Sequence, residues 1–219
     1  MGIPVFILGE SGSGKTAALR NFGENEIILF NVGKKRLPFR KKFNYTADES
    51  KYFPILSSLK KNNALAYVVD DSQYLMAFEY FNRSSETGYS KFTDIAVHFK
   101  QLVDTVINDT NQDTIVYFLH HTEKTEHGLK AKTIGKMLDE KITLEGLFTI
   151  VLRTQVENGN YQFVTQTNGM DTIKSPMEMF DLSLDNDLKQ VDSIIREYYD
   201  LKPLHDIKMI GEERHAAHC

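Results

Sequence analysis

Apolar residues fall into short unbroken runs along the first half of the chain, not into strict alternation with polar residues. Four such runs cover positions 3–8, 27–32, 65–69 and 115–119. Continuous apolar runs of about five residues are typical of strands that are buried on both faces of a parallel sheet. The pattern therefore predicts an α/β domain built on a mostly parallel sheet.

Helices and a hairpin are predicted between and after these strands. Over positions 92–107, apolar residues recur at intervals of three and one, which places them on one helix face that packs on the sheet. After residue 145, apolar segments at 147–152 and 161–164 flank a turn at Glu157-Asn158-Gly159-Asn160, as in a β-hairpin. Helical spacing returns over 188–198.

The predicted fold is thus a mostly parallel sheet flanked by helices, with a C-terminal β-hairpin at its edge and a C-terminal helix. A length of 219 residues favours one α/β domain over residues 1–180 and an acidic helical extension over 181–219. The last segment, GEERHAAHC, has no periodicity and is expected to be loose.

Composition narrows the class of protein. The chain is 41% hydrophobic and 26% charged with a net charge of −4, values typical of a globular protein and unlike a uniformly basic nucleic-acid coat. No apolar run approaches the ~20 residues of a membrane span, and the first residues do not resemble a secretory signal. With Cys219 as the single cysteine, we expect a cytoplasmic protein without disulfides.

The first predicted strand leads into a phosphate-binding motif. Residues 9–16 read GESGSGKT, which satisfies G-x-x-x-x-G-K-[ST] and precedes a helix predicted over 15–22. The glycines allow backbone conformations in which successive N–H groups point at phosphates, and the helix adds its positive N-terminus. Lys15 is expected to contact the β- and γ-phosphates, and the Thr16 hydroxyl to bind Mg²⁺. The nucleotide-binding candidates are Gly9, Glu10, Ser11, Gly12, Ser13, Gly14, Lys15 and Thr16.

Two adjacent carboxylates follow the third strand, in the sequence ALAYVVDD over residues 64–71. A buried strand ending in acids matches a Walker B element, which carries its first acid to the carboxyl edge of the sheet. Asp70 is therefore predicted to hold Mg²⁺ opposite Thr16. Asp71 is predicted to activate the attacking water, although a Glu is the usual base and an Asp is one methylene shorter.

The fourth strand ends in two histidines, His120 and His121. In phosphate-loop ATPases whose sensor strand lies between the phosphate-loop strand and the Walker B strand, a polar residue at its tip faces the γ-phosphate. His121 is the first candidate for this role and His120 the second, and the alternative is a pair of solvated loop histidines. Adjacent residues on a strand point to opposite faces, which disfavours a shared metal site.

Two clusters of cations follow the second and fourth strands. Phe39 and Phe43 are interleaved with the first cluster, a pattern that can track a nucleic-acid backbone and stack on bases. The alternative for both clusters is a solvated surface. Arg153 ends a predicted strand, either as a surface residue or as a finger to a neighbour's phosphate. The clusters are Lys34, Lys35, Arg36, Arg40, Lys41 and Lys42, and then, in an expected mobile loop, Lys124, Lys130, Lys132 and Lys136.

The segments GESGSGKT, YVVDD, LHHTEK and LDEKITLEGLFTIVLR together resemble the RecA-like branch of phosphate-loop ATPases. More closely, residues 1–180 are similar to the small RecA-core ATP-binding proteins of tailed bacteriophages, which act with single-strand DNA-binding protein in recombination by strand annealing. RecA carries its catalytic Glu after the second strand, where this chain reads NVGKKRLPF without an acid. Asp71 therefore takes that role by position.

The resemblance implies a RecA-like phosphate-loop NTPase fold with ATP and Mg²⁺ as ligands. It also implies an ATPase stimulated by single-stranded DNA, a homo-oligomer or a single-strand DNA-binding protein as partner, no membrane, and the cytoplasm of a bacterial host cell. Two other functions stay open from the sequence. One is a small-molecule phosphate-loop kinase, and the other is a regulatory nucleotide-binding module that hydrolyses little.

Overall fold

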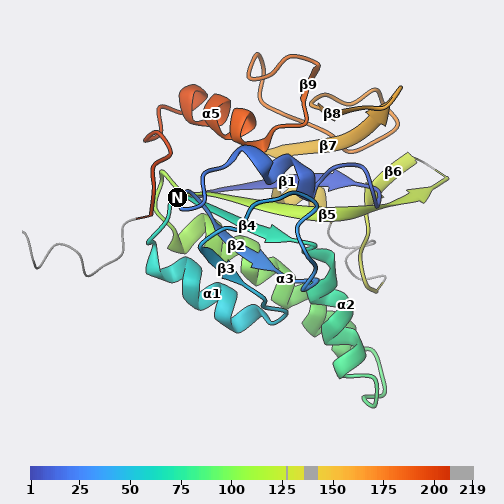
Figure 1. The fold of residues 1–219 in the computed structure, drawn as a ribbon. Coiled ribbons are helices and arrows are strands. Elements are labelled where there is room, and N and C mark those ends of the chain that lie inside the picture. Colours follow the sequence, from blue (N-terminus) through green and yellow to red (C-terminus); the bar gives the residue numbers. More distant parts are fainter. Residues whose placement is uncertain (127, 136–142, 208–219) are drawn as a thin grey trace, which may run out of the picture.

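The computed structural model describes residues 1–126, 128–135 and 143–207 (Figure 1). In chain order, the elements are β1 (Ile3–Gly9), η1 (Thr16–Asn21), β2 (Ile28–Asn31), β3 (Tyr45–Ala47), α1 (Tyr52–Lys61), β4 (Ala66–Asp70), α2 (Gln73–Asn82), α3 (Ser90–Asp109), β5 (Ile115–Thr125), β6 (Gly128–Ala131), η2 (Leu144–Leu147), β7 (Ile150–Glu157), β8 (Asn160–Val164), β9 (Ser183–Asp185) and α5 (Leu188–Tyr198).

The strands of this described part form a mostly parallel sheet in the order β3-β2-β4-β5-β1-β7-β8-β9, with β6 paired to β5. Neighbours are parallel from β3 through to β7. The pairs β7·β8, β8·β9 and β5·β6 are antiparallel. Because parallel strands end at the same edge, the carboxyl ends of β1, β2, β4 and β5 meet there.

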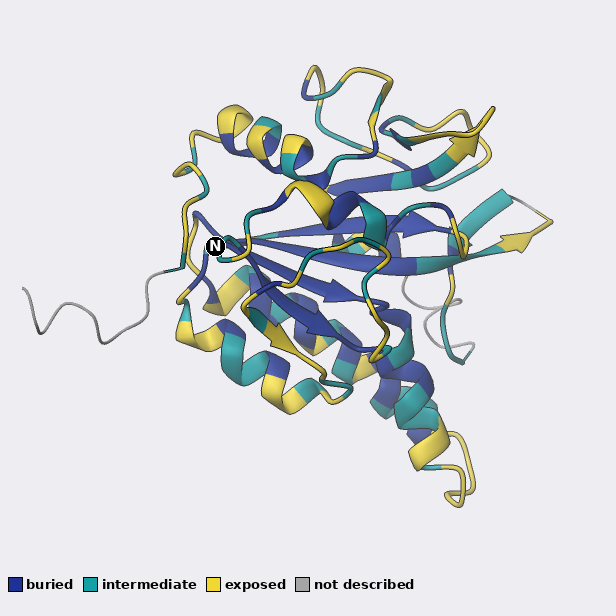
Figure 2. Ribbon diagram, in the orientation of Figure 1, coloured by how far each residue is buried: buried dark blue, intermediate teal, exposed yellow. Residues whose placement is uncertain are grey.

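Helices cover both faces of the sheet (Figure 1). The first face packs against α1, α2 and α3 and includes Phe6, Val69 and Phe118. The second face packs against η1, α5 and Phe43 of the segment between β2 and β3. Figure 2 shows the central strands buried along most of their length, as strands covered on both faces must be.

The α/β architecture and its main elements confirm the sequence prediction. The four apolar runs are β1, β2, β4 and β5, the amphipathic segment is α3, and the predicted hairpin is β7 and β8. The division of the chain at residue 180 stays a prediction. Leu188, Val191 and Ile195 of α5 pack in the same cluster as Val5 and Ile7 of β1.

Several local predictions need correction. The helix expected over 15–22 is the six-residue 3-10 helix η1. The hairpin is not the outermost edge, since β9 pairs with β8 outside it. The loop expected after β5 is an antiparallel hairpin in which Glu123 pairs with Lys130 and Lys124 with Leu129. The segment GEERHAAHC lies outside the described residues.

Candidate active site

The phosphate loop and the acidic pair meet at the carboxyl edge of the sheet. In the strand register, Gly9 lies opposite His121, and Asn31 lies opposite Asp70. The strand β5 separates β1 from β4, so the tip of β5 stands between the phosphate loop and the acids. A cavity of about 360 Å³ opens here, lined by the phosphate loop, residues 35–38, Asp70, Asp71, His121 and Tyr161.

Backbone geometry gives the phosphate loop its shape. Gly12 and Gly14 have φ angles of 79° and 96°, in the left-handed region that favours glycine. Gly9 is required for a different reason than the predicted backbone freedom. A Cβ at Gly9 would lie 2.1 Å from Thr154 Oγ1 and 2.4 Å from Ser13 Oγ, so the constraint is steric. Those two hydroxyls are themselves hydrogen-bonded at 2.6 Å, which ties the loop to β7.

Lys15 is buried beneath the loop and points into it. Its Nζ donates to the carbonyl oxygens of Gly9 at 2.9 Å and Glu10 at 2.8 Å. Burial lowers the pKa of Lys15 to about 8, against the opposing charges of Asp71 and Asp70. An ammonium held among backbone groups with little solvent is a strong site for an anion, because it gives up few contacts to water when the anion binds.

Thr16 and Asp70 lie in direct contact. The Thr16 hydroxyl donates to both carboxylate oxygens of Asp70 at 3.0 Å. Burial and the neighbouring charge of Asp71 raise the pKa of Asp70 to about 6, and the bond from Thr16 opposes them. Hydroxyl and carboxylate oxygens are the ligands that Mg²⁺ takes beside nucleotide phosphates, so this pair fits a Mg²⁺ ion.

Asp71 occupies a turn with a φ angle of 58° and faces a lysine and a histidine. Lys35 Nζ donates to its Oδ2 at 2.7 Å, and His121 Nε2 lies 3.1 Å from its Oδ1. Burial alone would raise the pKa of Asp71, but the bonds from His121 and Lys35 outweigh it and hold the pKa down to about 2. Asp71 is thus a charged hydrogen-bond acceptor at the cavity, and the neighbouring Asp70 has the higher pKa of the two.

The two histidines point in opposite directions, as predicted for neighbours on a strand. His120 is fully buried, with Nδ1 2.9 Å from Ser72 Oγ and Nε2 2.8 Å from the Lys132 carbonyl oxygen. Burial lowers the pKa of His120 to about 3. His121 instead faces the cavity, with its ring 5.8 Å from that of Tyr74. His120 is therefore a core residue, and His121 alone reaches the site.

The first cation cluster is divided between the cavity and a neighbouring groove. Lys35 and Arg36 line the cavity. Lys41 donates to the Arg20 and Phe22 carbonyl oxygens, which caps the end of η1. A wider groove of about 1030 Å³ follows, and its cations are Lys35, Arg36, Arg40, Lys41 and Lys42. Exposed Lys34 precedes Lys35 and has a φ angle of 52°.

The aromatic residues of that cluster do not match the predicted base-stacking pattern. Phe43 is buried against the core, and Phe39 packs against the same cluster with the two rings 6.2 Å apart. The two rings therefore pack against the core of the domain, and Phe43 has no exposed face on which a base could stack.

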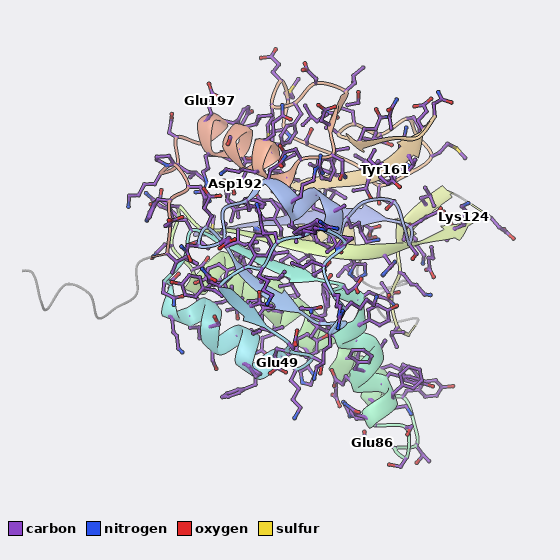
Figure 3. The ribbon with its side chains drawn as sticks, viewed as in Figure 1. Glu49, Glu86, Lys124, Tyr161, Asp192 and Glu197 are labelled. Carbon is purple, nitrogen blue, oxygen red and sulfur yellow. The ribbon has the colours of Figure 1, made fainter. Side chains whose placement is uncertain are left out.

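Two members of the second cluster, Lys124 and Lys130, lie on the β5–β6 hairpin, which projects from the sheet (Figure 3). Lys124 pairs with Glu10 at 3.2 Å, and Lys130 pairs with Glu123 at 3.1 Å. Lys132 is exposed, and Lys136 lies outside the described residues. Part of this positive charge is therefore neutralised within the chain.

Arg153 lines a second cavity of about 380 Å³ together with Ser11, Ser13 and Lys124, and both sequence interpretations of Arg153 stay open. Its side chain is mostly buried, with Nε 3.6 Å from Asp171 Oδ2 and one nitrogen donating to Gln155 at 3.0 Å.

The structure adds residues to the site that the sequence motifs did not include. Thr154 anchors the phosphate loop, and Tyr161, Leu37 and Pro38 line the cavity beside it. They come from β7, β8 and the segment after β2, and only the chain fold brings them to the motif. In the sequence, the only feature that involves any of them is the hairpin pattern around Tyr161, and that pattern does not indicate that Tyr161 lies near the phosphate loop.

No family model matches the chain, and no curated protein matches it. Over residues 1–126, 128–135 and 143–207, no helix has the length and apolar character needed to span a bilayer. The same residues contain no group of three or more His, Cys, Asp or Glu side chains arranged to hold a metal ion.

Proposed function

We propose that the chain is a Mg²⁺-dependent ATPase with a single RecA-like domain. The observation that supports this most strongly is the meeting of GESGSGKT, the Asp70–Asp71 pair and His121 around one cavity. The strand order supports it further, because β5 lies between the phosphate-loop strand β1 and the acidic strand β4. This is the order expected of phosphate-loop ATPases with a sensor strand between those two.

In this proposal, the phosphate loop and Lys15 hold the triphosphate. Thr16 and Asp70 would hold Mg²⁺, which supplies charge neutralisation to the phosphate oxygens. Asp71 accepts a proton from water while the water oxygen bonds to the γ-phosphorus. The bond from that phosphorus to the bridging oxygen breaks, and ADP leaves with its electron pair. His121 lies against Asp71 and fixes the direction of its carboxylate.

Single-stranded DNA is the proposed macromolecular ligand, with the groove beside the cavity as its entry surface. The groove carries cations on a segment that also lines the cavity. A contact with a phosphodiester backbone would therefore act on the same segment that faces the nucleotide. The resemblance to annealing proteins of bacteriophages suggests recombination or replication in the cytoplasm of a bacterial host cell, with a single-strand DNA-binding protein or a second copy as partner.

A regulatory module that hydrolyses little is the second candidate, and one observation favours it. Asp71 is engaged by both Lys35 and His121, and this holds its pKa down to about 2. A carboxylate with such a low pKa is a weak base. The rate of ATP hydrolysis by the wild-type chain distinguishes the ATPase from the regulatory module.

The test pairs nucleotide binding with turnover in wild type and in Asp71→Asn. We expect wild type to bind and hydrolyse ATP with Mg²⁺, and Asp71→Asn to bind ATP within a few-fold of wild type with turnover reduced at least about a hundredfold. Asp181→Asn, at an exposed carboxylate, is the matched control. Full turnover by Asp71→Asn would move the base to another residue, and binding without turnover in wild type would favour the regulatory module.

A further inference from the structure

Lys35 is held in the cavity by its backbone as well as by its side chain. The buried Asn31 side chain accepts from the Lys35 backbone N–H at 3.1 Å and donates to the Lys35 carbonyl oxygen at 2.8 Å. The same amide donates to Asp48 at 2.9 Å. A side chain that bonds both backbone groups of one residue fixes that residue's position, so Lys35 is anchored at the end of β2.

The turn before Lys35 is shaped to let it approach Asp71. A Cβ at Gly33 would lie 2.7 Å from Asp71 Oδ2, so only glycine leaves room for that carboxylate. The Lys35 ammonium then reaches the same oxygen at 2.7 Å. It also lies 4.9 Å above the centre of the Tyr74 ring, which holds a cation by its π face.

The ammonium nevertheless keeps donors for a ligand. An ammonium has three N–H donors, and Asp71 takes one of them. The Lys35 side chain is 59% exposed and lines the same cavity as Lys15 and Thr16. The cavity thus has an exposed ammonium at Lys35 and a buried one at Lys15.

We propose that Lys35 is a built-in cation that binds the terminal phosphate of the nucleotide and releases Asp71 for the attacking water. This rests on the proposed function. The phosphate oxygens and the Asp71 carboxylate compete for one ammonium, so binding of a triphosphate draws Lys35 towards the phosphate. Negative charge that builds on the phosphate oxygens during transfer is then stabilised by both Lys15 and Lys35.

Two consequences separate this role from simple support of the fold. A diphosphate lacks the phosphate that Lys35 contacts, so the residue increases affinity for a triphosphate and not for a diphosphate. The same contact strengthens as charge develops, so it also increases kcat. A residue that merely pairs with Asp71 to stabilise the loop would change affinity for both nucleotides alike.

The experiment compares ADP and a non-hydrolysable ATP analogue by titration calorimetry, together with ATP turnover, in wild type, Lys35→Ala and Lys35→Arg. For Lys35→Ala we expect affinity for the analogue to fall about tenfold, affinity for ADP to stay within twofold, and kcat to fall at least about a hundredfold. Lys35→Arg should recover part of both losses. Lys61→Ala, which removes one exposed charge at the end of α1, is the control and should match wild type.

Each result has a clear meaning. An unchanged preference for the triphosphate and unchanged kcat in Lys35→Ala would overturn the role of Lys35 and leave the proposed ATPase standing. An equal loss of affinity for both nucleotides would show a structural role and also overturn it. If wild type bound neither nucleotide, the ATPase proposal would fail, and the role of Lys35 would fail with it.

Discussion

Neighbouring residues of the same type have opposite surroundings at two places near the cavity. His120 is enclosed by the rings of Phe6 and Phe99, with centroids at 4.9 and 5.8 Å, whereas His121 faces Asp71. Asp70 has a raised pKa and Asp71 a lowered one. The alternation of faces along a strand predicts that the two histidines of β5 diverge, whereas Asp71 diverges from Asp70 because the strand β4 ends at Asp70 and the chain turns. The alternation does not say which histidine is enclosed, because that depends on the strands and helices on either side.

The burial of His120 makes stability depend on pH. Its pKa is about 3 in the folded chain and about 6.5 when unfolded, so the unfolded state binds the extra proton between these values. Its stabilising contribution is complete above pH 6.5 and is lost as the pH falls towards 3. Between pH 7.5 and 5.5 we expect the free energy of unfolding, measured in urea, to fall by about 1.4 kcal/mol from this residue.

The variant His120→Gln isolates that contribution because it removes the titrating ring. The difference in unfolding free energy between wild type and this variant should shrink by about 1.4 kcal/mol between the same two pH values. A difference that does not change with pH would mean that His120 titrates normally in the folded chain.

At the scale of elements, α5 is joined to the sheet by a buried ionic network. Arg196 donates to Asp192 on its own helix at 2.5 Å. It also donates to the carbonyl oxygens of Asp113, Lys202 and Leu65 at 2.8–2.9 Å. Tyr117 of β5 donates to the other oxygen of Asp192 at 2.8 Å. The network joins α5 to the segments at the amino ends of β4 and β5.

Removing Arg196 should therefore be costly. In Arg196→Met, the buried Asp192 carboxylate loses its charged partner and keeps the bond from Tyr117, and the Asp113 and Lys202 carbonyl oxygens lose the Arg196 donor. We therefore expect a loss of about 3–5 kcal/mol in the free energy of unfolding. The double variant Arg196→Met, Asp192→Leu removes the buried charge as well and should recover part of the loss. Urea unfolding measures the free energy of unfolding of both variants. A loss below about 1 kcal/mol in Arg196→Met would contradict a stabilising role for this network.

Sequence periodicity predicted the long elements better than the short ones. The segment α3 carries a clear apolar stripe and β1, β2, β4 and β5 are unbroken apolar runs, so local pattern was enough. The strands β3 and β9 have three residues each, too few to show a period. The hairpin of β5 and β6 is rich in charged residues, and this composition predicts a loop there instead of strands.

At the scale of the whole molecule, the site depends on the order of strands in the sheet. The motifs at Gly9–Thr16 and Asp70–Asp71 could be recognised locally, because their spacing is set by chemistry. Lys35, Thr154 and Tyr161 could not, since they reach the cavity through pairings between distant strands. Lys35 was predicted as a DNA contact, whereas the structure joins it to Asp71.

The basic groove makes a separate prediction about DNA. The double charge reversal Arg40→Glu, Lys42→Glu alters two exposed cations of the groove that do not line the cavity of Lys15 and Asp70. We expect affinity for a labelled single-stranded oligonucleotide, measured by fluorescence anisotropy, to fall at least about tenfold and the dependence of binding on salt to become shallower.

Two comparisons locate the DNA surface. Lys51→Glu, Lys61→Glu makes the same change in net charge away from the groove and should bind DNA like wild type. Lys130→Glu, Lys132→Glu tests the β5–β6 hairpin in parallel, with ATP binding expected to stay unchanged. If the groove variant bound DNA as wild type does, the groove would be excluded as the DNA surface.

The most direct test of the central proposal is steady-state ATP hydrolysis by the wild-type chain, measured with and without Mg²⁺ and against Lys15→Ala. We expect hydrolysis that requires Mg²⁺, disappears in Lys15→Ala and increases several-fold with single-stranded DNA at low salt. Hydrolysis that persists in Lys15→Ala, or its absence from wild type under all of these conditions, would contradict an ATPase centred on this cavity.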